Sequence, residues 1–211
     1  MVRFGISVDA GPRVYISADA DFLGFTEHVK RFSEAIGGKA IYPPKRGFTA
    51  LTGAVEKDMD GKVIGVDVLH KIVGLDADDV RKRALEVTHP KDPSFRFSVM
   101  DPVDCLISRF ENLRRIPEKQ NEVGVWQARI AISVCRAYTQ ELIKIGDERK
   151  AIKVATAVFQ VAGSATGLQN YKKYGLDILE AIPLDRFENA NFRNEQAPRS
   201  MAKISKARKN L

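Results

Sequence analysis

The sequence has few residues of the kinds that build metal or disulfide sites. Its 211 residues include two cysteines, three histidines and one tryptophan. Two cysteines exclude a disulfide-rich scaffold, and neither Cys105 nor Cys135 has a second cysteine or a histidine at metal-ligand spacing. Both cysteines lie in apolar helical patterns, so we predict thiols that are buried and behave as small hydrophobic side chains.

Long apolar runs are also missing. No run approaches the roughly 18 residues that a membrane-spanning helix needs. The first twenty residues lack the basic and then apolar pattern of a secretory leader, because Asp9 and Asp19 interrupt them. The chain is 44% apolar and 29% charged, which is an ordinary globular composition. We therefore expect a cytoplasmic protein that has no membrane partner and folds as one domain or two small ones.

Positive charge is in excess and is unevenly distributed. Lysine and arginine number 34 against 27 acidic residues, a net charge of +7. Much of the excess lies in residues 193–211, where six basic residues accompany a single acid, Glu195. Such a tail suits contacts with nucleic-acid phosphates, and it equally suits a solvated helix end. Both interpretations stay open from the sequence.

The first hundred residues alternate short strand patterns with one clear helix. Thr26 to Ile36 carries apolar residues at helical spacing and is followed by Gly37-Gly38, a typical helix end. The turn pair Asp60-Gly61 between two strand patterns predicts an antiparallel hairpin. We predict a helix over 76–84 and strands over 13–16, 20–23, 39–42, 49–56, 62–69 and 95–99. Residues 1–100 are thus expected to form an α+β domain with a small mixed, largely antiparallel sheet and flanking helices.

From Asp101 onwards the pattern is helical. Asp101 is a good N-cap, and Pro102 suits the first helical position. This helix should end before Pro117, and further helices are expected over 122–145 and 147–163, with a basic helix at the end. The apolar stripe expected for the second of these helices is Trp126, Ile130, Val134, Tyr138 and Leu142. Residues 101–211 are therefore expected to form a helical domain with a basic C-terminal tail.

Three aspartates stand out among apolar neighbours. Asp19 and Asp21 are two residues apart in a strand pattern, so their side chains should lie on the same face. Two carboxylates this close repel each other unless a cation lies between them, and Mg²⁺ is commonly held by one or two carboxylates. Asp67 stands alone in the apolar strand pattern 62–69, where a buried charge is costly without a partner. A neighbouring strand that brings Asp67 to the pair would complete a three-carboxylate site.

This arrangement resembles a known family. The segment Asp19-Ala20-Asp21-Phe22, the helix behind it, the hairpin and the strand from Gly65 to Leu69 resemble the nucleotidyltransferase fold of the DNA polymerase beta superfamily. The chain is most similar to bacterial nucleotidyltransferase-like proteins related to abortive-infection and toxin–antitoxin systems. The helical segment from Asp101 to Leu113, with Pro117-Glu118-Lys119 after it, is similar to the helix that follows the sheet in those proteins. The resemblance covers about residues 10–145.

The resemblance implies a two-magnesium site for moving a nucleoside monophosphate from a nucleoside triphosphate to a hydroxyl. Asp19, Asp21 and Asp67 would be the metal-binding and catalytic residues, with Asp67 also accepting the proton of the acceptor hydroxyl. The acceptor could be RNA, a protein or a small molecule. The residues that the resemblance assigns to nucleotide binding are Ser17, Ser108, Arg109, Asn112 and Lys119. From the residues alone, a helix surface or a bridge to Glu111 and Asp104 explains Arg109 and Asn112 as well as nucleotide binding does.

The chain departs from the family at its start. The family has a Gly-Gly or Gly-Ser motif at a helix start before the aspartate pair, where backbone amides receive the triphosphate. Here only Gly5 and Gly11 precede Asp19, and neither is part of such a pair. Either a further segment lies upstream or the nucleotide site is incomplete. The alternative function is therefore an inactive protein of the same fold that binds nucleic acid or a protein partner, such as an antitoxin or a second copy of itself.

Overall fold

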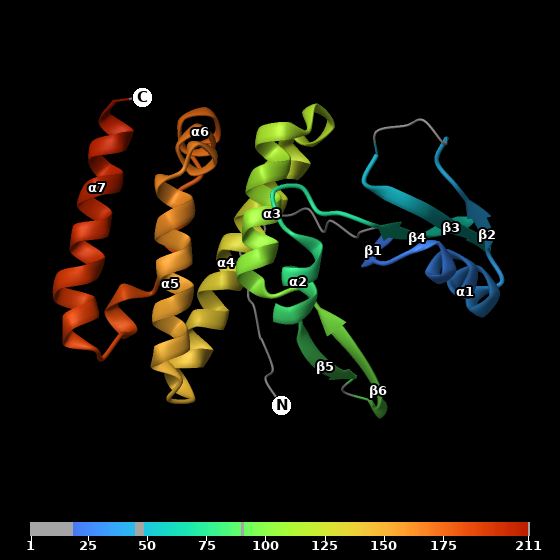
Figure 1. The fold of residues 1–211 in the computed structure, drawn as a ribbon, viewed down its shortest axis with the longest axis horizontal. Coiled ribbons are helices and arrows are strands. Elements are labelled where there is room, and N and C mark those ends of the chain that lie inside the picture. The colour runs from blue at the N-terminus through green and yellow to red at the C-terminus, as the bar shows by residue number, and fades with distance from the viewer. Residues whose placement is uncertain (1–18, 45–48, 90, 211) are drawn as a thin grey trace. The chain divides into compact units, whose positions relative to one another are not determined.

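The computed structural model describes residues 19–44, 49–89 and 91–210, and these form two compact units (Figure 1). The described part of the first unit is 19–82, and that of the second is 83–210. The predicted fold class is confirmed, since the chain is α+β, with a small mixed sheet, flanking helices and a helical C-terminal region. Along the chain, the first unit ends at Lys82 and the second continues from Arg83. The boundary that the sequence places at residue 100 stays a prediction.

The first unit is a four-stranded sheet with a helix on one face. Its strand order is β1-β4-β3-β2, in which β1 runs parallel to β4 and the other neighbours are antiparallel. The predicted strand over 13–16 lies outside the described residues. The elements are β1 (Asp19–Leu23), α1 (Thr26–Ile36), β2 (Lys39–Ile41), β3 (Leu51–Met59) and β4 (Lys62–Leu69), with α2 (Ala77–Arg83) leading to the second unit.

Helix α1 covers one face of this sheet. Val29 of α1 packs against Val55, Val66 and Val68 of the two central strands, and these four side chains form a small buried core. On β1, the ring of Phe22 lies against that of Phe32 at a centroid distance of 4.7 Å, although Phe22 is still 43% exposed. Side chains alternate along a strand, so the residues between these core positions lie on the face opposite α1.

Two glycine-containing turns fix this unit's geometry. Gly37 has a φ of 63° at the end of α1, which is the left-handed conformation that glycine adopts without strain. Between β3 and β4, Asp60 and Gly61 have φ values of 56° and 81°, as a tight two-residue hairpin turn requires. The predicted helix end and the predicted hairpin are both confirmed.

The second unit begins with a two-stranded hairpin and continues as packed helices. Helix α4 packs between α3 and α5, and α7 packs on α5 (Figure 1). Its strands are β5 (Leu85–His89) and β6 (Asp92–Val99), and its longer helices are α3 (Pro102–Arg115), α4 (Glu122–Lys144), α5 (Glu148–Gly163), α6 (Ala165–Tyr174) and α7 (Ala197–Lys209). Short helical turns connect them, namely η1 (Pro117–Lys119), η2 (Ile178–Ala181), η3 (Leu184–Arg186) and η4 (Phe192–Gln196).

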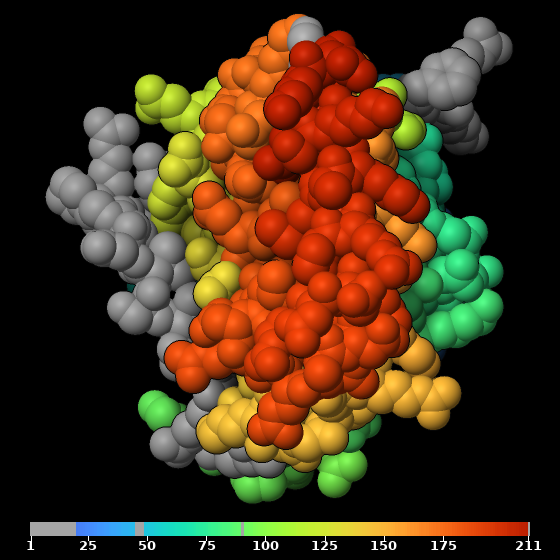
Figure 2. All heavy atoms as spheres, turned by 90° about the vertical axis from the view of Figure 1, so that its left-hand side faces the viewer, coloured from blue at the N-terminus to red at the C-terminus, as the bar shows by residue number. Residues whose placement is uncertain are grey.

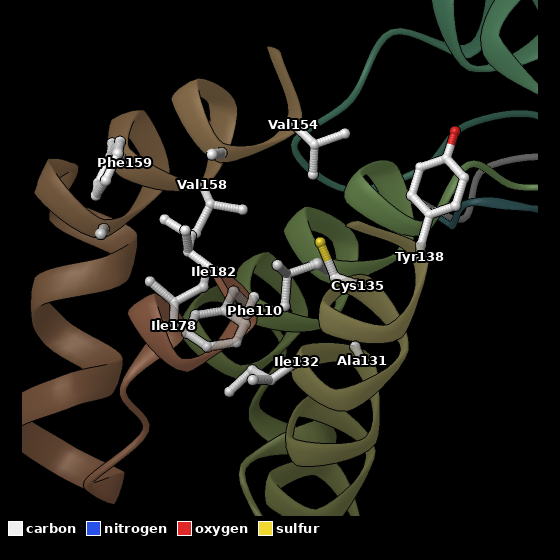
Figure 3. Packing of buried hydrophobic residues seen from close by; sticks show 14 of the residues in the cluster. Phe110, Ala131, Ile132, Cys135, Tyr138, Val154, Val158, Phe159, Ile178 and Ile182 are labelled. Atoms are coloured by element: carbon white, nitrogen blue, oxygen red, sulfur yellow. The ribbon is translucent and has the colours of Figure 1, made fainter. Parts of the chain in front are cut away.

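The second unit holds the larger hydrophobic core. Asp101 caps α3 as predicted, because its Oδ1 accepts the Val103 N–H at 2.8 Å. Phe110 of α3 is fully buried and lies among side chains of α4, α5 and η2 (Figure 3). Cys135 is also fully buried, and burial raises the pKa of its thiol to about 12, as expected for an unreactive thiol. Cys105 is half-buried, and burial raises its thiol pKa as well.

The buried face of α4 differs from the predicted stripe. Trp126, Ile130 and Val134 are only half-buried, and small residues take their place in the core. Residues four apart advance by about 40° beyond a full turn at each step, so a stripe of strict four-residue spacing winds around the helix. Of the predicted stripe, only the last two residues, Tyr138 and Leu142, therefore lie on the buried face of α4. The residues that are buried on α4 are Gly124, Ala128, Ala131, Ile132, Cys135, Tyr138, Thr139 and Leu142.

The junction of α5 and α6 depends on a glycine. A Cβ on Gly167 would lie 2.2 Å from the Val161 carbonyl oxygen and 2.8 Å from the Ala162 Cα, both of which are backbone atoms. We expect Gly167→Ala to lower the free energy of unfolding by about 1–3 kcal/mol, the usual cost of overpacking. Urea unfolding followed by the fluorescence of Trp126 measures this loss.

A neighbouring glycine provides the matched control. A Cβ on Gly163, at the end of α5, would meet only the Ile204 side chain, at an ordinary 3.7 Å. Because alanine is a better helix former than glycine by about 1 kcal/mol, Gly163→Ala should be neutral or stabilising. If both variants unfold at the same urea concentration, the close approach at Gly167 does not exist.

Helix α7 is held to the unit by an ion pair and an apolar contact. Figure 2 shows α7 lying across the surface of the helical unit, and its Ile204 is buried beneath it. Arg208 donates to both carboxylate oxygens of Asp177, at 2.9 and 2.6 Å, and its guanidinium lies 3.8 Å from the Tyr171 ring centroid. Burial alone would raise the pKa of Asp177, but the hydrogen bonds from Arg208 and the Leu179 N–H outweigh it and lower that pKa.

The lowered pKa gives this ion pair a pH-dependent contribution to stability. A carboxyl group whose folded pKa lies below its ordinary value stabilises the fold fully above that value and loses the contribution as pH falls through the folded pKa. Asp177→Asn should therefore cost about 1–3 kcal/mol of unfolding free energy at pH 7 and almost nothing near about pH 2. Urea unfolding at both pH values tests this. A loss of the same size at both would contradict a stabilising carboxylate.

Within the described residues, no single helix is both long enough and apolar enough to span a membrane. Helices α5 and α6 reach that length and composition only as a pair, and the pair is bent by 69°.

Candidate functional site

The first unit brings two of the predicted carboxylates together. In the parallel pairing of β1 with β4, Asp21 is the register partner of Asp67. Each residue lies between side chains that face α1, so both carboxylates lie on the opposite face of the sheet. Asp21 is exposed and Asp67 is half-buried. The backbone of Asp19 pairs with Gly65, one pair before the Asp21–Asp67 pair on the same two strands.

The surroundings of this pair are set by β3. Ala54 is the partner of Asp67 on that side, so the neighbouring strand contributes only a methyl group next to the carboxylate. Glu56 pairs with Gly65 and places a further exposed carboxylate on the same face, with Lys39 of β2 as its own partner. The sequence reasoning missed Glu56 and Lys39, because their place beside the aspartates depends on strand order rather than on a local pattern.

The chemistry of this face fits a hard divalent cation. Neighbouring strands lie about 4.8 Å apart, a spacing at which carboxylates on adjacent strands can share an ion whose oxygen ligands lie at about 2.1 Å. Among the side chains that the structure describes, no three of the types histidine, cysteine, aspartate or glutamate are arranged to hold a metal ion. The described side chains thus supply two of the three predicted ligands, Asp21 and Asp67. The side chain of Asp19 lies outside the described part, as does all of Ser17.

The remaining predicted nucleotide-binding residues belong to the second unit. Ser108, Arg109 and Asn112 are half-buried and lie at three- and four-residue spacings on α3, so they share one helix face. Arg109 Nη1 donates to Gln127 Oε1 of α4 at 3.3 Å. Lys119 is exposed at the end of η1. A joint site of these residues with the carboxylates of the first unit stays a prediction.

Glu111 and Asp104, which the sequence suggested as bridging partners of Arg109, form other pairs. Asp104 is buried and accepts two hydrogen bonds from Arg83, at 3.0 and 3.1 Å. Glu111 is also buried, accepts a hydrogen bond from the Thr166 hydroxyl, and lies 2.6 Å from Arg115 Nε. These pairs fasten α3 to the residues at the end of α2 and to α6, so their role is structural.

A cluster of titratable side chains that the sequence did not reveal lies at the start of α3. Burial raises the pKa of Asp101 and also that of Tyr138. The hydrogen bond with Tyr138 raises the pKa of Lys150, whose Nζ lies 5.5 Å from the Tyr138 ring centroid. Capping of α3 by Asp101 and burial of the phenol account for this cluster, and we assign it no chemistry.

Comparison of the chain with protein families, with curated proteins and with solved structures finds no match.

Proposed function

We propose that this chain is a metal-dependent nucleotidyltransferase that moves a nucleoside monophosphate from a nucleoside triphosphate to a hydroxyl acceptor. The observation that carries the proposal is the in-register pairing of Asp21 with Asp67 on parallel strands, on the face away from the hydrophobic core. Carboxylate oxygens on neighbouring strands are ligands of the kind that Mg²⁺ prefers in proteins, which supports the proposal.

In this proposal, Asp21 and Asp67 would hold Mg²⁺ together with Asp19. Two bound magnesium ions would stabilise the charge on the triphosphate during in-line displacement at the α-phosphorus. Asp67 would accept the proton of the acceptor hydroxyl, whose oxygen forms the new bond to phosphorus as pyrophosphate leaves. Ser17, Ser108, Arg109, Asn112 and Lys119 would contact the nucleotide, as the family resemblance implies. RNA, proteins and small molecules are all candidate acceptors, and a toxin–antitoxin role belongs to the same proposal.

Calorimetric titration with each nucleoside triphosphate in the presence of Mg²⁺ tests the proposal. Wild-type protein should bind at least one triphosphate only when Mg²⁺ is present. The double variant Asp19→Asn with Asp21→Asn should lose that binding, because asparagine keeps the side-chain shape but removes the charge that holds the ion. Binding that is unaffected by the double substitution, or wild-type protein that binds no triphosphate, would contradict the proposal.

The control for lost charge uses two acids of the same unit. Asp60 lies in the β3–β4 turn and Asp79 lies on α2, and both side chains are exposed. Asp60→Asn with Asp79→Asn removes the same two charges, so this variant should bind the triphosphate as the wild type does. Equal loss in both double variants would point to general electrostatics rather than to a site.

The alternative function is a binding protein of the same fold without catalysis, and the composition of α7 is the observation that favours it. Arg199, Lys203, Lys206 and Lys209 are exposed on this helix. Deletion of residues 193–211 would not test it cleanly, because Ala197 and Ile204 of this segment belong to the core. Lys203→Gln with Lys206→Gln removes charge without disturbing that core. Weaker binding to nucleic acid in this variant, in a protein that binds no triphosphate, would support the alternative.

A further inference from the structure

A groove with an apolar floor lies in the helical unit, where α5 and α7 run side by side (Figure 1) and the turn η4 leads into α7. Its volume is about 440 Å³, within the range of about 300–1,000 Å³ that is usual for small-molecule sites. Phe159 of α5, Phe192 of η4 and Ile204 of α7 line the groove and are each at most 9% exposed, so they form its floor. We call this feature the α5–α7 groove.

The floor of the groove suits a flat aromatic ring. The rings of Phe159 and Phe192 lie 6.4 Å apart between centroids and are tilted by 44°. Aromatic rings attract one another at centroid distances of about 4.5–7 Å, so a third ring on this floor gains contacts that an alkyl chain does not. Gly163 leaves room for such a ring, since even an added Cβ there would meet only the Ile204 side chain, at 3.7 Å.

The groove also has polar groups along its rim. These are the carboxamides of Gln160 and Gln196, the hydroxyl of Ser200 and the ammonium group of Lys203. None of these four side chains has a hydrogen bond or an ion pair with any residue in the part of the chain that the structure describes. Their donors and acceptors are therefore available to a ligand.

The charge of Lys203 is not matched by an acid on the elements that form the groove. On α5 the single acid is Glu148, which accepts the backbone N–H groups of Glu188 and Asn189. On η4 the single acid is Glu195, which lies 2.6 Å from Arg199 and does not line the groove. The C-terminal end of α5 adds only about half a negative charge. The groove thus favours a ligand that carries one negative charge.

The backbone of η4 supports the assignment of a site. This turn is a π-helix, in which the Ala197 N–H donates to the Phe192 carbonyl five residues earlier. Turns of this kind are rare in proteins and are found frequently at functional sites. Phe192 and Gln196 are the first and last residues of the turn, and both line the groove. The unusual turn therefore contributes to the floor and to the polar rim.

We infer that the α5–α7 groove binds a small aromatic monocarboxylate, with the ring on the phenylalanine floor and the carboxylate paired with Lys203. A single lysine neutralises one carboxylate, whereas a phosphate monoester carries about 1.5–2 negative charges at neutral pH. The inference concerns only residues of the helical unit and requires neither Mg²⁺ nor a triphosphate. Failure of the transferase test would leave it unaffected, and its own failure would leave the transferase proposal unaffected.

The experiment is a titration of the ¹⁵N-labelled full chain with 2-naphthoate, followed by amide chemical shifts. The amide signals of Gly163, Gln196 and Lys203 should shift with a dissociation constant on the order of 0.1–1 mM, as expected for a ligand of about a dozen non-hydrogen atoms. The uncharged analogue 2-naphthamide keeps the ring and should bind on the order of tenfold more weakly. This is the low end for loss of a hydrogen bond to a charged group, because the rim is exposed to solvent.

Two lysine variants of α7 test the role of the charge. Lys203→Met keeps the apolar stem and removes the ammonium group, so it should bind 2-naphthoate about tenfold more weakly and 2-naphthamide as the wild type does. Lys206 is exposed on the same helix and does not line the groove, so Lys206→Met should bind both compounds as the wild type does. Raising the salt from about 50 to 200 mM should weaken binding of 2-naphthoate to the wild type but not to Lys203→Met.

A third variant tests the place of the ring. Gly163→Leu puts a side chain over the floor and should abolish the shifts at Gln196 and Lys203. The inference is overturned if 2-naphthamide binds the wild type as tightly as 2-naphthoate, or if Lys203→Met and Lys206→Met have equal affinities for 2-naphthoate. Unchanged binding by folded Gly163→Leu, or wild-type protein that shows no shifts up to about 10 mM 2-naphthoate, would also overturn it.

Discussion

Replacing Asp21 with asparagine should reduce Mg²⁺-dependent release of pyrophosphate from a nucleoside triphosphate by about a thousandfold or more. Asp21 is one of the two carboxylates that the sheet places in register, and asparagine cannot supply the negative charge that holds the cation. A bound metal ion contributes several kcal/mol of transition-state stabilisation, and each 1.36 kcal/mol corresponds to a factor of ten in rate. Pyrophosphate release with a total-RNA or total-protein acceptor pool measures this effect.

Asp67→Asn should have an effect at least as large. The same substitution removes a metal ligand and also the group proposed to accept the proton of the acceptor hydroxyl. Higher Mg²⁺ concentrations can relieve a weakened metal site in part. They cannot replace a missing general base, because asparagine does not accept the proton. For this reason we expect added Mg²⁺ to restore more activity to Asp21→Asn than to Asp67→Asn.

Asp60→Asn is the control for this pair of variants. Asp60 has a φ of 56° in the hairpin turn, a conformation that asparagine also tolerates, so the sheet should fold as before. The activity of this variant should stay within about twofold of the wild type, as expected for a surface substitution away from the site. If Asp21→Asn retained the same activity as Asp60→Asn, the Asp21–Asp67 pair would not be the metal site.

The elements that the sequence predicts best are those that end or begin at a characteristic turn residue. The helix Thr26–Ile36 and the strand Lys62–Leu69 were predicted with the bounds that the structure has. The first ends at a left-handed glycine, and the second begins directly after Asp60-Gly61. Such signals are local, since they depend on the backbone freedom of one or two residues and not on tertiary packing.

Elements and faces that depend on packing were predicted less well. The strand β5 (Leu85–His89) was not predicted, and its partner β6 begins at Asp92 rather than at residue 95. All residues of β6 are exposed, so no alternation of buried and exposed residues marks this hairpin. Phe22 follows Asp21 on the strand, so alternation alone would turn it into the core, but it is 43% exposed while it packs on Phe32. In each case the exposure of the side chains depends on which neighbouring helix or strand packs against them.

The candidate site likewise combines features that a local sequence pattern predicts with features that depend on tertiary structure. A lone aspartate within an apolar strand pattern indicates a partner for Asp67, but the partner's identity depends on which strand lies beside β4. The parallel pairing that places Asp21 there joins residues 46 positions apart in the chain, and no local pattern encodes it. The sequence therefore predicted the residue types of this face, whereas its register, together with Ala54, Glu56 and Lys39, came from the sheet topology.

The largest loss of stability is expected from Phe110→Ala. The Phe110 side chain is fully buried, and Figure 3 shows its ring among Ile132, Ile178 and Ile182. Truncation of a buried phenylalanine costs about 3–5 kcal/mol, since burial of the ring is lost and a cavity remains. Domains of this size have unfolding free energies of about 5–15 kcal/mol, so the variant should lose a large fraction of its stability.

Urea unfolding followed by tryptophan fluorescence measures this loss in the relevant unit, because the single tryptophan, Trp126, lies on α4. With a slope of about 2 kcal/mol per molar urea, the midpoint should fall by about 2 M. Phe95→Ala makes the same chemical change on β6, where the side chain is 56% exposed, and should shift the midpoint by less than about 0.3 M. Equal shifts in the two variants would mean that Phe110 is not at the centre of the packed core. A large shift for Phe110→Ala alone would show that α3 joins α4, α5 and η2 into one cooperative unit.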